Sequence, residues 1–142
     1  MKALAALLLL LPGLAFGQPR PFSCVGAEAL EDDVFAVPFA RGADRLEDAA
    51  RSGIEAAAVL ARAAPERNIC VLGHADRGQG AESSTQLAAR RARAVAQALS
   101  ARGVERDRIR AEARVGAFSG RGEEPGARAV TIMLMPLPPE AE

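Results

Sequence analysis

The chain has 142 residues, of which 49% are hydrophobic, and its 18 Lys and Arg residues balance its 18 Asp and Glu residues. This length suits one domain with a single hydrophobic core. A balanced charge gives no field that would attract nucleic acid or an anionic membrane, and the absence of Trp and Tyr removes the usual stacking platform for bases and sugar rings. We therefore expect no nucleic-acid partner.

Residues 1–17 have the pattern of a secretory signal peptide. Lys2 supplies the positive end, an apolar run follows, and a Pro-Gly pair precedes small residues typical of a cleavage site, which we place after Gly17. The apolar run is far shorter than the roughly 20 residues that span a bilayer, so we expect a periplasmic protein whose mature chain has no transmembrane span. The expected organisation is a signal peptide over 1–17, a Pro-containing extension over 18–32, a folded domain over 33–135 and a Pro-rich tail without ordered structure over 136–142.

The two cysteines suggest a disulfide, because an exported chain folds in an oxidising compartment. Cys24 lies in the extension, and Cys70 lies in an apolar segment further along the chain. A bridge between them would hold the extension across the sheet and would stabilise the fold by about 3 to 4 kcal/mol if it acts through chain entropy. The alternative is a pair of small buried thiols.

The first half of the domain predicts a strand and then a helix. Residues 33–39 are mostly apolar, and Pro38 marks this strand as an edge strand or an interrupted one. Asp44 with Glu47 three residues later has the form of a helix cap, and the helix is expected to end before Pro65. The expected buried stripe of this helix is Leu46, Ala50, Ile54, Ala57, Leu60 and Ala61.

The second half predicts a strand, a helix and two further strands. Residues 68–72 are typical of a buried strand, and Ser83-Ser-Thr-Gln86 has the form of a capping box, with Ser83 as the cap of a helix that runs to about Arg102. The last two strands are expected over 109–115 and 130–134, where apolar and polar residues alternate. Together the elements predict an α/β two-layer sandwich of βαβαββ order, with both helices on one face of a mixed four-stranded sheet.

Arg91 is expected to face the body of the domain. At 100° per residue it falls within the apolar stripe formed by Leu87, Val95 and Leu99, whereas Arg90 points to the opposite side of the helix. Burying a charge costs several kcal/mol unless an acid or a ligand offsets the cost. Arg91 is therefore a candidate ligand-binding residue; the alternatives are a structural salt bridge and a side chain that reaches back to solvent.

Two motifs carry a resemblance to a known family. Gly73-His-Ala-Asp76 after the buried strand, followed by Leu87-x-x-x-Arg91-Ala92 on the helix, resembles the motif of the OmpA-like domain. That domain is the peptidoglycan-binding module of OmpA-type porins, peptidoglycan-associated lipoproteins and flagellar stator proteins. The resemblance covers about residues 35–134 and implies the sheet order 1-4-2-3. It also implies that Asp76 holds the ammonium, and Arg91 the carboxylate, of diaminopimelate in the stem peptide of the cell wall.

The same resemblance implies further ligand-binding positions at Ser84, Arg128, Ala40 and Gly42. Several positions depart from the family pattern, and each departure removes a hydrogen-bonding side chain, whereas the two charged residues remain. The departures are Ala40 for an acid, Ala75 for Thr, Ser84 for Asn, Ala88 for Ser and Ala129 for a second Arg. Non-covalent binding requires no chemical step, so we expect no enzyme activity, no cofactor and no metal.

Other functions remain open at this point. His74 and Asp76 are two residues apart and could both bind a metal ion, but this is the only His in the chain and three or four ligands are usual. We expect His74 to pack below the site instead. A hydrolase would need a nucleophile beside a base, and no such motif is present. The departures favour a second class of function, in which the domain has lost the wall ligand and binds other envelope proteins.

Overall fold

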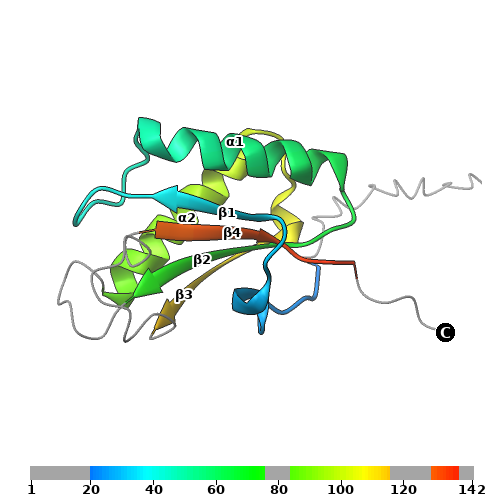
Figure 1. The fold of residues 1–142 in the computed structure, drawn as a ribbon, viewed down its shortest axis with the longest axis horizontal. Helices are drawn as coiled ribbons and strands as arrows, with labels where there is room; N and C mark the ends of the chain where they lie inside the picture. Colours follow the sequence, from blue (N-terminus) through cyan, green and yellow to red (C-terminus); the bar gives the residue numbers. More distant parts are fainter. Residues whose placement is uncertain (1–19, 76–83, 116–128, 138–142) are drawn as a thin grey trace, which may run out of the picture.

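Four strands form a mixed sheet with two helices on one face (Figure 1). The structure is a computed structural model, and it describes residues 20–75, 84–115 and 129–137. The elements are η1 (Ala27–Ala29), β1 (Val34–Pro38), α1 (Asp48–Ala63), β2 (Ile69–Ala75), α2 (Thr85–Ala101), η3 (Arg106–Arg108), β3 (Ile109–Val115) and β4 (Ala129–Leu134). In this described part, no helix is long and apolar enough to cross a membrane.

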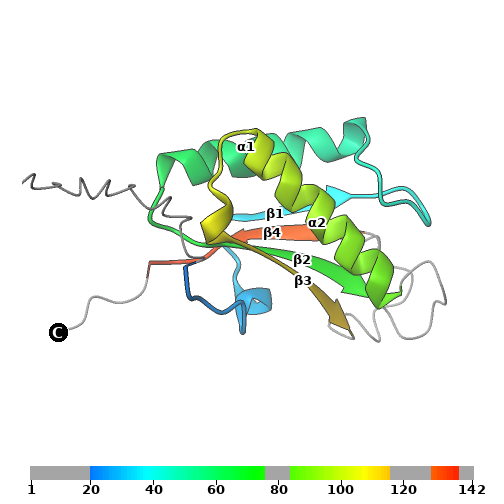
Figure 2. The same cartoon turned by 180° about the vertical axis from the view of Figure 1, so that it is seen from behind.

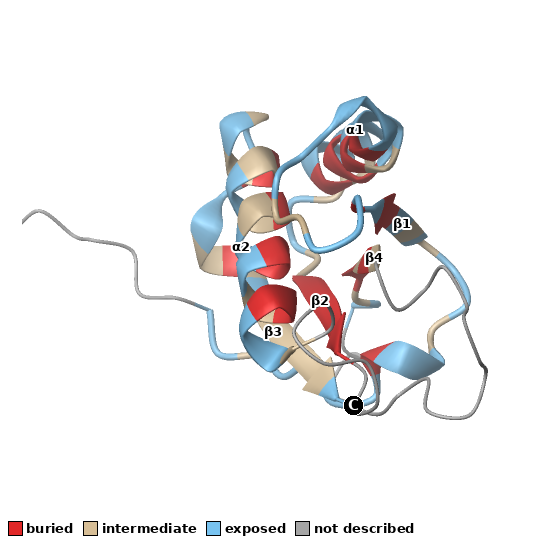
Figure 3. Ribbon diagram, turned by 90° about the vertical axis from the view of Figure 1, so that its left-hand side faces the viewer, coloured by how far each residue is buried: buried red, intermediate tan, exposed pale blue. Residues whose placement is uncertain are grey.

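The strand order is β1-β4-β2-β3, which confirms the predicted fold class. Strand β4 pairs antiparallel with both β1 and β2, and β2 pairs parallel with β3. Pro38 lies in β1, an edge strand, where a missing N–H donor is tolerated. Seen from the rear in Figure 2 and from the end in Figure 3, α1 and α2 lie side by side on one face, and their buried residues turn toward the sheet.

Strand β2 is buried along its whole length. Its side chains alternate between the two faces, so Ile69 and Val71 enter the core beneath the helices while Cys70 and Leu72 enter a second apolar cluster. A strand covered on both faces is typical of a central position next to a parallel neighbour. The buried apolar run in the sequence therefore marked the middle of the sheet.

Two glycines allow the helices to approach the sheet closely. A Cβ atom added at Gly73 of β2 would lie 2.8 Å from the carbonyl carbon of Ala88 in α2, and closer still to its oxygen. A Cβ atom at Gly53 of α1 would lie 2.5 Å from the carbonyl oxygen of Ala36 in β1. Real Cβ contacts almost never fall below 3.0 Å. Gly73 therefore sets how closely the start of α2 packs on β2.

The first helix begins later than its sequence predicts. Helix α1 starts at Asp48, and Glu47 precedes it without a side-chain cap bond, so Asp44 as the cap was wrong. Asp44 instead forms an ion pair with Arg90, at 3.0 Å. Leu46 precedes the helix and is 38% exposed, which corrects its place in the buried stripe. Asp44 takes a partner 46 residues away in sequence, and local spacing carries no signal for such a pair.

The second helix is capped by Ser84 rather than by Ser83. The Ser84 hydroxyl accepts a hydrogen bond from the backbone N–H of Leu87 at 3.2 Å, and α2 begins at Thr85. The predicted cap was therefore one residue too early. At the other end, Gly103 has a φ of +89°, the left-handed conformation that commonly follows the last turn of a helix.

The N-terminal strap, defined here as residues 20–32, lies on the sheet face opposite the helices (Figures 1 and 2). Cys24 of the strap and Cys70 of β2 form a disulfide, as predicted. Around it, strap and sheet residues form the second apolar cluster, made of Cys24, Ala27, Cys70, Leu72 and Met133 with Phe22, Leu30 and Met135 at its margin. The extension thus covers the second face of the sheet.

Candidate functional site

One end of the sheet gathers the segments that the sequence motifs occupy. Strands β1, β2 and β3 are mutually parallel, so their carboxyl ends lie at the same end of the sheet, and α2 starts there (Figure 1). The first turn of α2 presents N–H groups and a partial positive charge at this rim. In sheets with parallel strands, this end commonly carries the ligand.

Arg91 turns inward at this rim and is 1% exposed, as the helical period predicts. Its Nε donates to the carbonyl oxygen of Ala43 at 2.7 Å, and its Nη2 donates to the carbonyl oxygen of Ala40 at 3.2 Å. The guanidinium also lies 5.4 Å from the ring centroid of Phe39, within the range of a cation–π contact. These contacts fix the plane in which the guanidinium lies.

The carbonyls that bind Arg91 belong to a tight turn after β1. The backbone N–H of Ala43 donates to the Ala40 carbonyl at 3.1 Å, and Gly42 has a φ of +70°, which a residue with a side chain rarely adopts. Asp44 and Arg90 close the far side of the turn with their ion pair. Two adjacent arginines of α2 thus bind this turn, Arg91 through carbonyls and Arg90 through a carboxylate.

His74 lies below the rim on the face covered by the strap, and it is 5% exposed. Its Nε2 lies 2.8 Å from Oγ1 of Thr131 in β4, which joins the two strands near their ends. Burial lowers the pKa of His74; the nearby Glu28 opposes this shift and Arg114 adds to it. The imidazole is therefore neutral near pH 7. Within the described segments, no three His, Cys, Asp or Glu residues gather in a way that could hold a metal ion.

The sequence profile of the OmpA family matches residues 38–129. The chain belongs to the OmpA family. A search among curated proteins finds no match.

Solved structures of OmpA-like domains share the fold at low sequence identity. The OmpA-like domain of FopA1 from Francisella tularensis subsp. tularensis SCHU S4 is 20% identical, with a TM-score of 0.60 over 75% of this chain and 79% of that one. The peptidoglycan-associated lipoprotein from Burkholderia pseudomallei is 24% identical, with a TM-score of 0.57 over 71% and 88%. The periplasmic domain of Helicobacter pylori MotB is 19% identical, with a TM-score of 0.62 over 78% and 79%.

The structure brings some of the predicted site residues of this OmpA-family chain together. Ala40 and Gly42 meet Arg91 through the turn that they form, and Ser84 lies at the start of the same helix, where its hydroxyl is used as the cap. Asp76 and Arg128 lie outside the described residues, as do Ser83 and the predicted signal peptide. The pairing of Asp76 with Arg91 around a ligand therefore stays a prediction.

One departure from the family pattern has a packing role. Ala88 is 1% exposed, and its backbone lies directly against Gly73 of β2. The motif glycine and the start of α2 are therefore packed tightly, and Ala88 offers no hydroxyl at this contact. Ala75, which replaces the family's Thr, is the last residue of β2 and is 7% exposed.

The sequence analysis missed a second buried arginine, Arg108, which lies just before β3 and is fully buried. It donates to the carbonyl oxygens of Ala61 at 2.6 Å and Ala64 at 3.1 Å, which belong to the last turn of α1. It also pairs with Glu105 at 2.6 Å. Its position in a short 3-10 helix gave no periodic signal. The contacts of Arg108 thus join η3 to the end of α1.

Proposed function

We propose that this OmpA-family chain binds peptidoglycan non-covalently through the diaminopimelate head of the stem peptide. In this proposal, Asp76 accepts from the ammonium and Arg91 donates to the carboxylate. The observation that carries the proposal is the buried guanidinium of Arg91 at the sheet end where the carboxyl ends of the parallel strands meet the start of α2. No bond is made or broken, so the proposed activity is binding and not catalysis.

The turn after β1 supports this role by orienting Arg91. A free guanidinium samples many orientations, whereas two bonds to backbone carbonyls and the Phe39 ring restrict this one. A pre-oriented charge loses less conformational entropy when it binds a carboxylate. Arg91 thus suits a small ligand with a fixed distance between its opposite charges.

The expected affinity of one site is modest. Two charge-assisted hydrogen bonds contribute about 1.5 to 3 kcal/mol each, which corresponds to dissociation constants from about millimolar to tens of micromolar. The wall repeats the same stem peptide many times, so a domain that dissociates rebinds nearby. Retention on the wall therefore does not require a tight single site.

The proposed location is the periplasm, after export by the signal peptide over residues 1–17. The disulfide between Cys24 and Cys70 supports this location, because such bonds persist in oxidising compartments. From there the domain would reach both the cell wall and proteins of the outer membrane.

A second candidate function is an envelope protein-protein module that no longer binds the wall. It is favoured by the contacts of Arg91, which show a structural role in holding the turn after β1 to α2. The absence of a side-chain acid at Ala40 and of a side-chain amide at Ser84 points the same way. If this second function holds, Arg91 stabilises the fold as Arg108 does, by donating hydrogen bonds to backbone carbonyls.

Co-sedimentation with purified sacculi separates the two functions. The wild-type chain is expected to pellet with sacculi that contain diaminopimelate, and free diaminopimelate is expected to release it. Lysine blocked at its α-amino and α-carboxyl groups presents an ammonium without a neighbouring carboxylate, so it should not release the chain. Asp76→Asn should abolish pelleting because it removes the partner of the ammonium while preserving side-chain size.

Two variants control for the loss of a charge. Glu66→Gln removes an exposed acid and Arg93→Ala removes an exposed arginine of α2, both outside the turn after β1, so both should leave pelleting intact. Arg91→Lys keeps the charge but loses the planar fork, so it should weaken pelleting while the thermal midpoint is checked separately. A wild-type chain that stays in solution with diaminopimelate-type sacculi would refute wall binding and favour the protein-protein module.

A further inference from the structure

The N-terminal strap covers the sheet without joining it. Among the residues that the structure describes, the hydrogen bonds between two backbone groups are internal to the strap, apart from the Arg20 N–H, which donates to the Asp107 carbonyl of η3 at 3.0 Å. No strand of the sheet pairs with the strap. The core beneath the helices also contains no strap residue. The strap can therefore leave the sheet without breaking a strand pairing or opening the main core.

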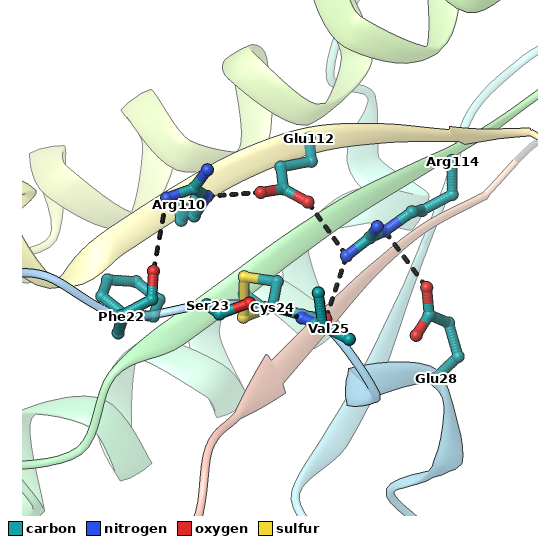
Figure 4. Close-up of polar contacts among 9 residues, drawn as sticks. Phe22, Ser23, Cys24, Val25, Glu28, Arg110, Glu112 and Arg114 are labelled. Carbon is teal, nitrogen blue, oxygen red and sulfur yellow. Dashed lines mark hydrogen bonds and ion pairs between the residues drawn. A yellow bond between two sulfur atoms is a disulfide. The ribbon is translucent and has the colours of Figure 1, made fainter.

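Polar contacts from β3 hold the strap in place (Figure 4). Arg114 donates to the carbonyl oxygen of Cys24 at 2.9 Å and forms an ion pair with Glu28 at 3.1 Å. Arg110 donates to the carbonyl oxygen of Phe22 at 3.3 Å. Both arginines also contact Glu112, which lies between them on β3. These contacts are partly exposed, so each contributes about 1 kcal/mol or less and can open transiently.

Apart from the peptide chain, which continues from the strap through Asp33 into β1, the disulfide is the one covalent link between the strap and the sheet in the described chain. It joins Cys24 to Cys70 at the centre of the second apolar cluster, and the two residues are 1% and 0% exposed. A thiolate reaches a disulfide only along an open path to one of its sulfurs. Because the strap and the sheet bury both cysteines between them, we expect that path to open when the strap rises from the sheet.

We propose that the Cys24–Cys70 bond is a reversible redox latch that controls whether the strap covers the sheet. The reductant is a dithiol, either a small molecule or a thioredoxin-like protein. One of its thiolates attacks Sγ of a latch cysteine and displaces the other as a thiolate, giving a mixed disulfide. Its second thiolate then breaks that bond. The chain gains two electrons and two protons as two thiols, and the dithiol becomes a disulfide.

Opening the latch changes one face of the domain. Leu72 of β2 and Met133 of β4 lose their apolar cover, and Arg114 loses the Cys24 carbonyl and Glu28. The helices and the strand pairings stay in place, because no strap residue belongs to the core beneath the helices and none pairs with a strand. The reduced chain is thus a folded domain with an uncovered sheet face. This proposal does not depend on wall binding.

Hydrogen exchange measured by mass spectrometry tests the latch on the full purified chain. After treatment with dithiothreitol and alkylation of both thiols, exchange over residues 20–32 should rise about tenfold or more, while β2 and β4 stay protected. Binding of an apolar dye should increase in parallel. The double variant Cys24→Ser with Cys70→Ser should match the reduced chain without any reductant.

A matched pair of strap variants tests whether opening controls reduction. Glu28→Gln weakens the ion pair with Arg114 and should speed reduction of the intact disulfide by dithiothreitol. Glu31→Gln makes the same change at an exposed position of the strap and should leave the rate unchanged.

Three results would overturn the latch. If hydrogen exchange in β2 and β4 rises as much as in the strap, the disulfide stabilises the whole domain and does not control the strap alone. A double serine variant that fails to fold would have the same meaning. A strap that stays protected after both thiols are alkylated would show that the disulfide does not hold it.

Discussion

Replacing Gly73 with Ala should both destabilise the domain and disturb the rim. The added Cβ would lie 2.8 Å from the carbonyl carbon and 3.2 Å from the Cα of Ala88, and closer still to the carbonyl oxygen. All of these are backbone atoms, so α2 must move away from β2 by roughly half an ångström or more. Overpacking of this kind costs about 1 to 3 kcal/mol, which corresponds to a fall of about 10 °C in the thermal midpoint. Thermal and urea unfolding measure the loss.

The control is the same substitution beneath the other helix. Gly53→Ala places its Cβ 2.5 Å from the carbonyl oxygen of Ala36, but Ala also favours the interior of α1 by about 1 kcal/mol, so its net loss should be smaller. Arg91 lies three residues after Ala88, so only Gly73→Ala should move it. On the proposed function, sacculus binding should weaken about tenfold in Gly73→Ala and stay unchanged in Gly53→Ala. A Gly73→Ala variant as stable as the wild type would refute this account of the helix contact.

Two further predictions concern buried titratable or charged groups. Arg108→Met removes the guanidinium bonds to the carbonyls of Ala61, Ala64 and Arg67 and the ion pair with Glu105, and it should lower the free energy of unfolding by about 3 kcal/mol. Arg106→Met at an exposed site should change it by less than about 0.5 kcal/mol, and equal stability of the two variants in urea would contradict the role given to Arg108. Because burial lowers the pKa of His74 below its ordinary value of 6.5, the unfolded chain binds the proton more readily, so the stability that His74 contributes is complete above pH 6.5 and is lost as the pH falls. His74→Gln should remove this part of the pH dependence of unfolding, and an unchanged profile would argue against a neutral buried imidazole.

Arg91 and Arg108 illustrate two uses of a buried guanidinium in one small domain. Arg108 lies at the far end of α1 and donates to the carbonyls of Ala61 and Ala64, which each also accept one backbone N–H. Arg91 also bonds to carbonyls, but these belong to a turn at the rim rather than to a helix end. Loss of Arg91 therefore affects the position of the turn as well as any ligand contact. For this reason the test of wall binding relies on Asp76→Asn and on control variants outside the turn.

Local patterns in the sequence were enough to predict most of the fold. Apolar alternation located β3 and β4, because side chains on a strand face opposite sides at every second residue, and short apolar runs located β1 and β2. The helical period placed Arg91 on the buried face of α2, which the structure confirms. The disulfide was also within reach, since the chain has only two cysteines. The OmpA-like motif supplied the strand order that periodicity alone could not give.

Only the tertiary structure decided what several of these side chains contact. Asp44 has the sequence pattern of a helix cap but pairs with Arg90. The burial of Arg108 follows from its contact with the end of α1, which no local pattern predicts. The acceptors of Arg91 are backbone carbonyls. The bonds from Arg110 and Arg114 to the carbonyls of the strap were likewise absent from any local pattern. The physical reason is common to all four. A short stretch of sequence sets backbone conformation and which side of an element is apolar, whereas a charged or polar group finds its partner among segments that meet only when the chain is folded.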